Sequence, residues 1–77
     1  MKEFSLIQAK ENEKLVIVSI MGGRMATKRL ADMGLVPGIE IKVLRKAPFG
    51  PIEIEAKGTK LVLGRGLAAK VFVKYEE

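Results

Sequence analysis

The chain contains neither cysteine nor histidine, and this double absence limits what so short a polypeptide can fold into. Its 77 residues are expected to form one domain, because chains divide into domains at roughly 100 to 200 residues each. A domain of this size buries only about 60% of the surface of its unfolded chain, so it usually needs a staple or a very regular scaffold. Neither a disulfide nor an ordinary structural zinc site can be that staple here. We therefore expect regular β hydrogen bonding to hold residues 1–77 together.

The same absence restricts function. It removes the Cys and His nucleophiles, the usual general base near neutral pH and the preferred transition-metal ligands, so we expect no enzyme. Lys and Arg number 14 against 9 Asp and Glu, and the net charge of +5 favours an anionic partner such as RNA, an acidic protein face or an anionic membrane. No secretory signal is evident, and the longest purely apolar run, Leu15 to Val18, is far too short to span a bilayer. A cytoplasmic protein is expected.

Short segments with β-type patterns alternate with turn residues along the chain. We expect strands at residues 14–21, 39–46, 52–56, 60–63 and 71–75. Between the first two, Ala26, Leu30 and Met33 recur at helical spacing and predict a helix over 24–33, while 67–69 suit a single helical turn. Five short strands and one short helix indicate a mostly β protein. We expect them to close into a small barrel, because closure removes the exposed edges of a sheet.

The end of the predicted helix carries an unusually complete stop signal. Gly34 can adopt the left-handed conformation just past the helix, which places Leu35 against Leu30 in a Schellman-type cap. Pro37-Gly38 follows at once and suits a type II turn, whose third residue needs a positive φ. The chain should therefore turn sharply from the helix into the next strand.

This corner resembles that of a known family. Residues 29–38 read RLADMGLVPG, which is similar to the RL.dmGl.pG signature of the FeoA family, the small cytosolic companions of the bacterial ferrous-iron transporter. The glycines before the helix, the segment 47–51 and the closing strands follow the order of that family, so the resemblance covers nearly the whole chain. It implies a single SH3-like, FeoA-type domain over residues 1–77. It also implies docking on the membrane permease FeoB, whose cytoplasmic G domain hydrolyses GTP.

The resemblance leaves a related alternative. The SH3-like domain of iron-dependent repressors shares this fold and much of this pattern, but there it follows a part that binds DNA and metal. Because Met1 begins the domain here, we expect the transport accessory rather than the repressor domain.

Candidate partner-binding residues are those that the predicted helix and one loop display. Arg24, Lys28 and Arg29 give the helix a basic face, and Met25 beside them belongs either to the core or to an adaptable contact. Phe49 lies between prolines on a stiff loop, where it is either an exposed binding residue or a lid folded over the end of the barrel. We expect these five residues to contact FeoB. The alternative is that the basic face of the helix is a solvated surface without a binding role.

Two other patterns suggest chemistry but do not support it. Glu53 and Glu55 share one strand face, yet cross-strand ion pairs with Lys42 and Lys60 explain them without a metal. Two carboxylates without an imidazole hold a borderline divalent ion poorly, so we expect no metal site and no cofactor. Residues 22–28 place glycines and a lysine at the start of a helix, but their spacing is not that of a phosphate-binding loop.

A nucleic-acid-binding SH3-like domain is the alternative from another functional class, and the net charge of +5 is its attraction. Proteins that bind single strands need aromatic stacking platforms, whereas this chain is 5% aromatic and has no Trp. We therefore expect no nucleic-acid partner. Weak homo-oligomerisation through the partner-binding face is left open, and membrane association is expected only through the permease.

Overall fold

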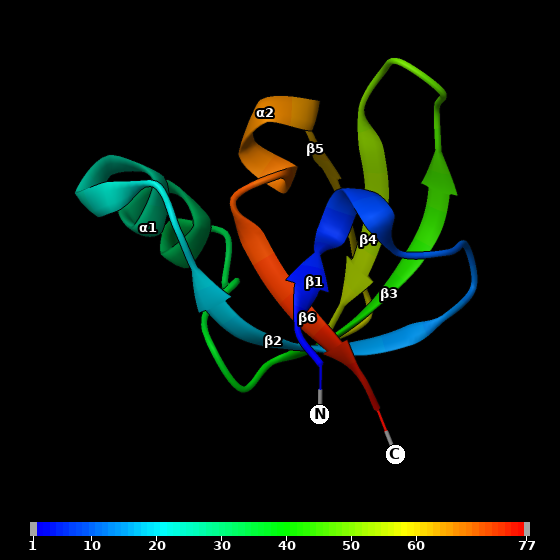
Figure 1. Ribbon diagram of the computed structural model, residues 1–77, viewed down its shortest axis with the longest axis horizontal. Helices are drawn as coiled ribbons and strands as arrows, with labels where there is room; N and C mark the ends of the chain where they lie inside the picture. The colour runs from blue at the N-terminus through cyan, green and yellow to red at the C-terminus, as the bar shows by residue number, and fades with distance from the viewer. Residues whose placement is uncertain (1, 77) are drawn as a thin grey trace.

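A computed structural model describes residues 2–76 of the chain, which form six strands, two α-helices and one 3₁₀ helix (Figure 1). In chain order these are β1 (Phe4–Ser5), η1 (Leu6–Gln8), β2 (Lys14–Ile20), α1 (Gly23–Asp32), β3 (Glu40–Lys46), β4 (Ile52–Ala56), β5 (Thr59–Leu63), α2 (Arg65–Ala68) and β6 (Val71–Tyr75). The predicted strands and the main helix are confirmed to within one or two residues. The helical turn expected at 67–69 begins two residues earlier, and β1 and η1 were not predicted.

The strands form one antiparallel sheet in the order β1-β6-β2-β3-β4-β5. The sheet curls around a common interior, as the ribbon in Figure 1 shows, so the mostly β prediction is confirmed. The barrel differs from the expected one in having a sixth strand and in not being closed by a ladder between its end strands, β1 and β5. The physical reason is that β1 has only two residues and passes directly into η1, which packs against α2 and β6.

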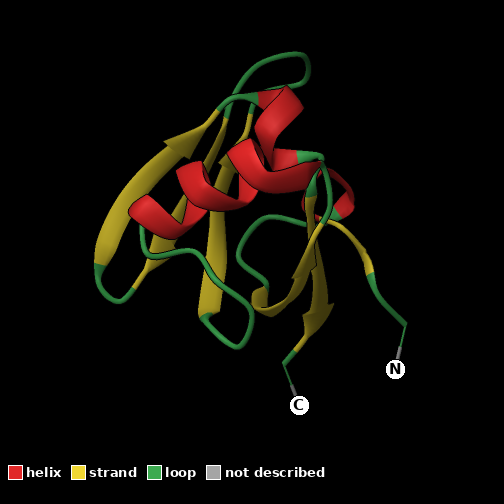
Figure 2. Cartoon of the chain, turned by 90° about the vertical axis from the view of Figure 1, so that its left-hand side faces the viewer, coloured by secondary structure: helices red, strands yellow, loops and turns green. Residues whose placement is uncertain are grey.

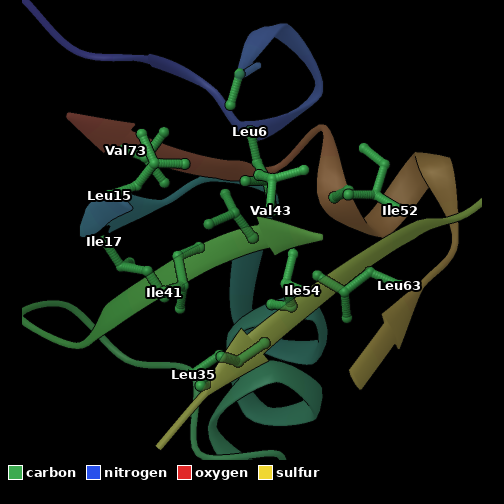
Figure 3. Packing of buried hydrophobic residues seen from close by; sticks show 14 of the residues in the cluster. Leu6, Leu15, Ile17, Leu35, Ile41, Val43, Ile52, Ile54, Leu63 and Val73 are labelled. Atoms are coloured by element: carbon green, nitrogen blue, oxygen red, sulfur yellow. The ribbon is translucent and has the colours of Figure 1, made fainter. Parts of the chain in front are cut away.

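The core is lined by the inward residues of every long strand. On β3 and β4 these are Ile41, Val43, Ile52 and Ile54, which point into the same interior as residues of β2 and β6 (Figure 3). The helices also contribute buried side chains to this core cluster. These are Leu6 from η1, Leu30 from α1 and Ala68 from α2.

The corner after α1 has the predicted geometry. Gly34 has a φ of +83°, its N–H donates to the Ala31 carbonyl at 2.9 Å, and the Leu35 N–H donates to the Leu30 carbonyl at 2.8 Å. These are the two hydrogen bonds of a Schellman motif. Leu30 and Leu35 are both fully buried, so the cap is joined to the core.

The turn that follows is tied to β2. Gly38 has a φ of +95°, and the Ile39 N–H donates to the Val36 carbonyl at 3.2 Å, which is the bond that closes a four-residue turn. The Gly38 N–H donates to the Ile17 carbonyl at 2.7 Å. The helix is therefore held at a defined position beside the sheet.

Within the described residues, no helix is long and apolar enough to cross a membrane.

Candidate docking surface

Helix α1 exposes one face because only its inward residues take part in the core. Ala26 and Leu30 are buried and Met33, just past the helix, is half-buried, whereas Arg24, Met25 and the rest of the predicted docking residues on this helix are exposed. Met25 is 80% exposed, so of its two predicted roles the core one is wrong. Figure 2 shows α1 lying across the front of the sheet, where its outer face is open to a partner.

The charges on this face are only partly neutralised. Lys28 Nζ lies 3.4 Å from Asp32 Oδ2, one helical turn away, and both side chains are well exposed. Such a pair contributes little to stability. Across residues 2–76, neither Arg24 nor Arg29 forms an ion pair. The helix therefore offers uncompensated positive charge at the surface.

Two further residues extend this surface, and sequence reasoning missed both. The Met21 N–H donates to the Lys70 carbonyl at 2.8 Å, and the Met21 side chain is 58% exposed. The Lys70 side chain crosses Gly22, so a Cβ at position 22 would lie 2.5 Å from Lys70 Cδ. No local pattern could have indicated Lys70, because it is brought here by the pairing of β6 with β2.

We call the resulting surface the α1 patch. It comprises Met21, Arg24, Met25, Lys28, Arg29 and Lys70. It contains four cationic side chains and two exposed thioethers, and Gly22, which has a positive φ, links Met21 to Gly23, the first residue of α1. A surface of this kind suits an acidic partner, because methionine side chains adapt to varied contacts while the charges steer association.

Phe49 forms a separate feature. It is 96% exposed, so the lid interpretation is wrong and the side chain stands in solvent. Two hydrogen bonds hold the ends of the loop close together. The Ala47 N–H donates to the Pro51 carbonyl at 3.3 Å, and the Gly50 N–H donates to the Ala47 carbonyl at 3.4 Å. Figure 1 places this β3–β4 loop at the upper right and α1 at the far left. The structure therefore brings the four helix residues together but not Phe49.

Of the two strand carboxylates, Glu53 takes part in an ion pair. Glu55 is opposite Lys42 on one side and Lys60 on the other, as expected, but the ion pair forms diagonally, with Lys60 Nζ 3.1 Å from Glu53 Oε1. Among residues 2–76, no three His, Cys, Asp or Glu side chains cluster as they would around a metal ion.

A shallow groove of about 460 Å³ lies on the outer face of the sheet, beside the β4–β5 turn. Its charged lining residues carry both signs and are Lys14, Glu40, Lys42, Glu55 and Lys57. At its border, a hydrogen bond with Glu40 raises the pKa of the Glu76 carboxyl above its ordinary value. None of the five predicted docking residues lines this groove.

Comparison with known proteins identifies the family. The profile of the FeoA domain matches residues 4–75. The chain belongs to the FeoA family. It is 39% identical over 74 residues to the "Putative Fe(2+) transport protein A" of Methanocaldococcus jannaschii, covering 96% of this chain and 89% of that protein.

Solved structures give the same assignment and confirm the SH3-like fold. A crystal structure of an iron uptake regulatory protein, FeoA, superimposes with a TM-score of 0.91 at 37% identity, covering 97% of this chain and 100% of the other. A manganese-dependent transcriptional repressor, in complex with manganese, also reaches a TM-score of 0.91, but at 18% identity and with only 38% of its chain covered. That second likeness shows a shared fold alone, so this FeoA-family chain resembles the repressor domain in architecture.

Proposed function

We propose that this FeoA-family protein is a non-enzymatic accessory and regulatory module of ferrous iron uptake that binds the cytoplasmic side of the FeoB GTPase-permease. The observation that carries the proposal is the α1 patch, a basic and thioether-rich face on a helix held rigidly by its Schellman cap. Relatives named for iron transport and iron uptake regulation support the system in which it acts. Its place at the membrane would then come from the permease.

An accessory protein regulates its partner only if it binds two states of that partner with different affinity. A bound protein shifts an equilibrium between two states of its partner only by as much as its affinity for the two states differs. A helix that is held rigidly on the sheet suits this role, because little backbone entropy is lost on binding. The α1 patch would therefore bias the permease or its G domain toward whichever state presents a complementary acidic face.

Phe49 is proposed as a second contact. An exposed aromatic side chain on a narrow loop between Pro48 and Pro51 can enter a pocket at small entropic cost. Because helix α1 and the β3–β4 loop, which carries Phe49, lie on different sides of the molecule in Figure 1, they would contact different segments or domains of the permease. The predicted docking surface is thus divided into two.

The nucleic-acid alternative lacks suitable aromatic residues. Phe4 and Tyr75 pack against each other with ring centroids 4.9 Å apart, and Phe72 is half-buried. Among the described aromatic residues, Phe49 is the one whose side chain is almost fully exposed, whereas proteins that track single strands use several stacking platforms along a basic groove. This distribution supports a protein partner over an oligonucleotide.

The test is charge reversal on the helix. Arg24, Lys28 and Arg29 are changed together to Glu, and retention of the detergent-solubilised permease is measured on the immobilised variant. We expect at least about a tenfold loss of affinity, since charge complementarity controls such encounters. The chain should stay folded with a melting temperature changed by only several degrees, because exposed substitutions usually change stability by about 0.5 kcal/mol or less each.

A matched control makes the experiment specific. Lys2, Lys10 and Lys57 are exposed and lie outside the α1 patch, so their joint replacement by Glu changes the net charge by the same amount. This control should retain the permease. Equal loss in both variants would show a general effect of charge, and unfolding of the helix variant would refute its assignment to the surface.

A further inference from the structure

β5 is an end strand of the sheet, and its outer edge carries main-chain N–H and C=O groups that form no hydrogen bond with another strand. Lys57 and Gly58 have φ values of +52° and +77°, which form the two-residue hairpin turn in which Ala56 and Thr59 are a hydrogen-bonded pair. Antiparallel pairs alternate between hydrogen-bonded and non-bonded. Leu61 is therefore bonded to β4, whereas the N–H and C=O groups of Lys60 and Val62 point away from the sheet.

This edge is open. β5 is the terminal strand of the sheet, and Figure 2 shows it as the outermost strand at the left. No turn or loop hydrogen bond within the described chain reaches Lys60 or Val62. Val62 is 56% exposed on one face of the strand, and Leu61 is half-buried on the other.

The edge also lacks most of the usual protection against pairing. Natural edges are blocked by short strands, prolines, bulges, inward-pointing charges or charged side chains on the edge, above all Lys. The opposite edge, β1, is only two residues long, but β5 has five residues in regular register with β4. Lys60 is the one charged residue of β5, and its Nζ lies 3.1 Å from Glu53 Oε1 on the neighbouring strand, so this charge is partly compensated within the sheet.

The side chains of β5 are self-complementary in one register. If a two-fold axis passes through Leu61, Lys60 of each strand faces Val62 of the other, and the two Leu61 residues face each other. The outward N–H and C=O groups of Lys60 in one copy then form hydrogen bonds with those of Val62 in the other, and the two Leu61 residues form the non-bonded pair between them. This is the alternation of bonded and non-bonded pairs that an antiparallel ladder requires. Facing lysines, which would repel, are avoided.

We propose that β5 is a self-association edge, at which two copies of the chain pair antiparallel through Lys60, Leu61 and Val62. A second copy is the natural occupant because the register matches the edge to itself. The pairing adds main-chain hydrogen bonds and covers Val62 and Leu61, but each copy carries a net charge of +5. Association should therefore be weak and should strengthen as salt screens this repulsion. It is independent of the α1 patch and of the proposed function.

The test follows two observables. Sedimentation equilibrium on the full chain up to about 1 mM should show a monomer–dimer equilibrium that shifts toward dimer with added salt. Amide hydrogen exchange by NMR should slow with concentration at Lys60 and Val62, whereas Leu61 should be protected at every concentration. A monomer throughout, with unchanged exchange at Lys60 and Val62, would overturn the proposal.

Three variants localise the contact. Val62→Pro removes an N–H that points outward and leaves the β4–β5 ladder intact, so the chain should fold and stay monomeric. Val62→Lys should also stay monomeric, because the new lysine of each copy would face Lys60 of the other. This variant replaces the proline variant if the latter does not fold. Met25→Lys adds the same charge to the α1 patch and should dimerise as the unmodified chain does. Dimers abolished by Met25→Lys but not by the Val62 variants would place association at the α1 patch and refute the edge.

Discussion

Gly34 and Gly66 allow a sharp test of how the corner that presents the α1 patch is built. Both are exposed, and a Cβ added at either would meet no atom within 4 Å. They differ in backbone conformation, since Gly34 has a φ of +83° whereas Gly66 lies inside α2. Replacing each by Ala therefore isolates the conformational energy from steric effects.

The expected magnitudes follow from this difference. Holding Ala in the left-handed region costs roughly 1–2 kcal/mol. Ala lowers the entropy of the unfolded chain, which stabilises by about 0.4–1 kcal/mol, so Gly34→Ala should destabilise by about 1 kcal/mol. Gly66→Ala should stabilise by about 0.5–1 kcal/mol, because no strain opposes the gain. For a domain of this size, 1 kcal/mol corresponds to about 4–8 °C in melting temperature.

Thermal unfolding followed by circular dichroism, with calorimetry to establish two-state behaviour, measures both changes. Gly34→Asn provides a graded control, because Asn tolerates the left-handed region better than Ala and should recover part of the loss. An equal fall in melting temperature for Gly34→Ala and Gly66→Ala would refute the assignment of Gly34 as the residue that ends the helix. A melting temperature that Gly34→Ala leaves unchanged would refute it as well.

Three further outcomes are expected. Phe49→Ala should leave the melting temperature within about 2 °C of the original, because the side chain is 96% exposed, while lowering affinity for the permease in the same retention assay. Leu30→Ala should lower the free energy of unfolding by about 2–5 kcal/mol in a urea titration, since this side chain is fully buried. An NMR titration should place the pKa of Glu76 above that of an ordinary glutamate side chain, and Glu40→Gln should lower it by removing the carboxyl partner. Because the folded state of the unmodified chain binds this proton more tightly than the unfolded state does, the contribution of Glu76 to stability should be full below the ordinary glutamate pKa and should decline as pH rises through the raised pKa.

The parts of the fold that sequence predicted well depend on local chemistry. Gly34 and the Pro37-Gly38 pair define backbone conformations within a few residues, so the helix end and the next turn followed from residue types alone. The strand alternation was equally local. β1 escaped prediction because two residues carry no periodicity, and its position depends on pairing with residues near the other end of the chain, at Phe72 and Val73.

The candidate site was less predictable because it depends on three-dimensional placement. Lys70 joins the α1 patch through the β2–β6 ladder, which no motif in the sequence encodes. The exposure of Phe49 could not be decided either, since a loop between prolines can fold back or project. Glu53 rather than Glu55 pairs with Lys60, although Glu55 is its direct neighbour, because a long side chain can reach diagonally across the strand.

The structure separates the residues of α1 that specify the fold from those available for function. Leu30 and Ala26 attach the helix to a core that a manganese-dependent repressor shares in outline, at a TM-score of 0.91 but only 18% identity. A fold common to such different proteins cannot by itself define a partner. Selection for docking would then act on outward positions such as Arg24 and Met25, which can change without loss of packing because the core uses neither. For this chain, specificity should follow the charge and shape of the α1 patch, while the Schellman corner keeps the patch in a constant position on the sheet.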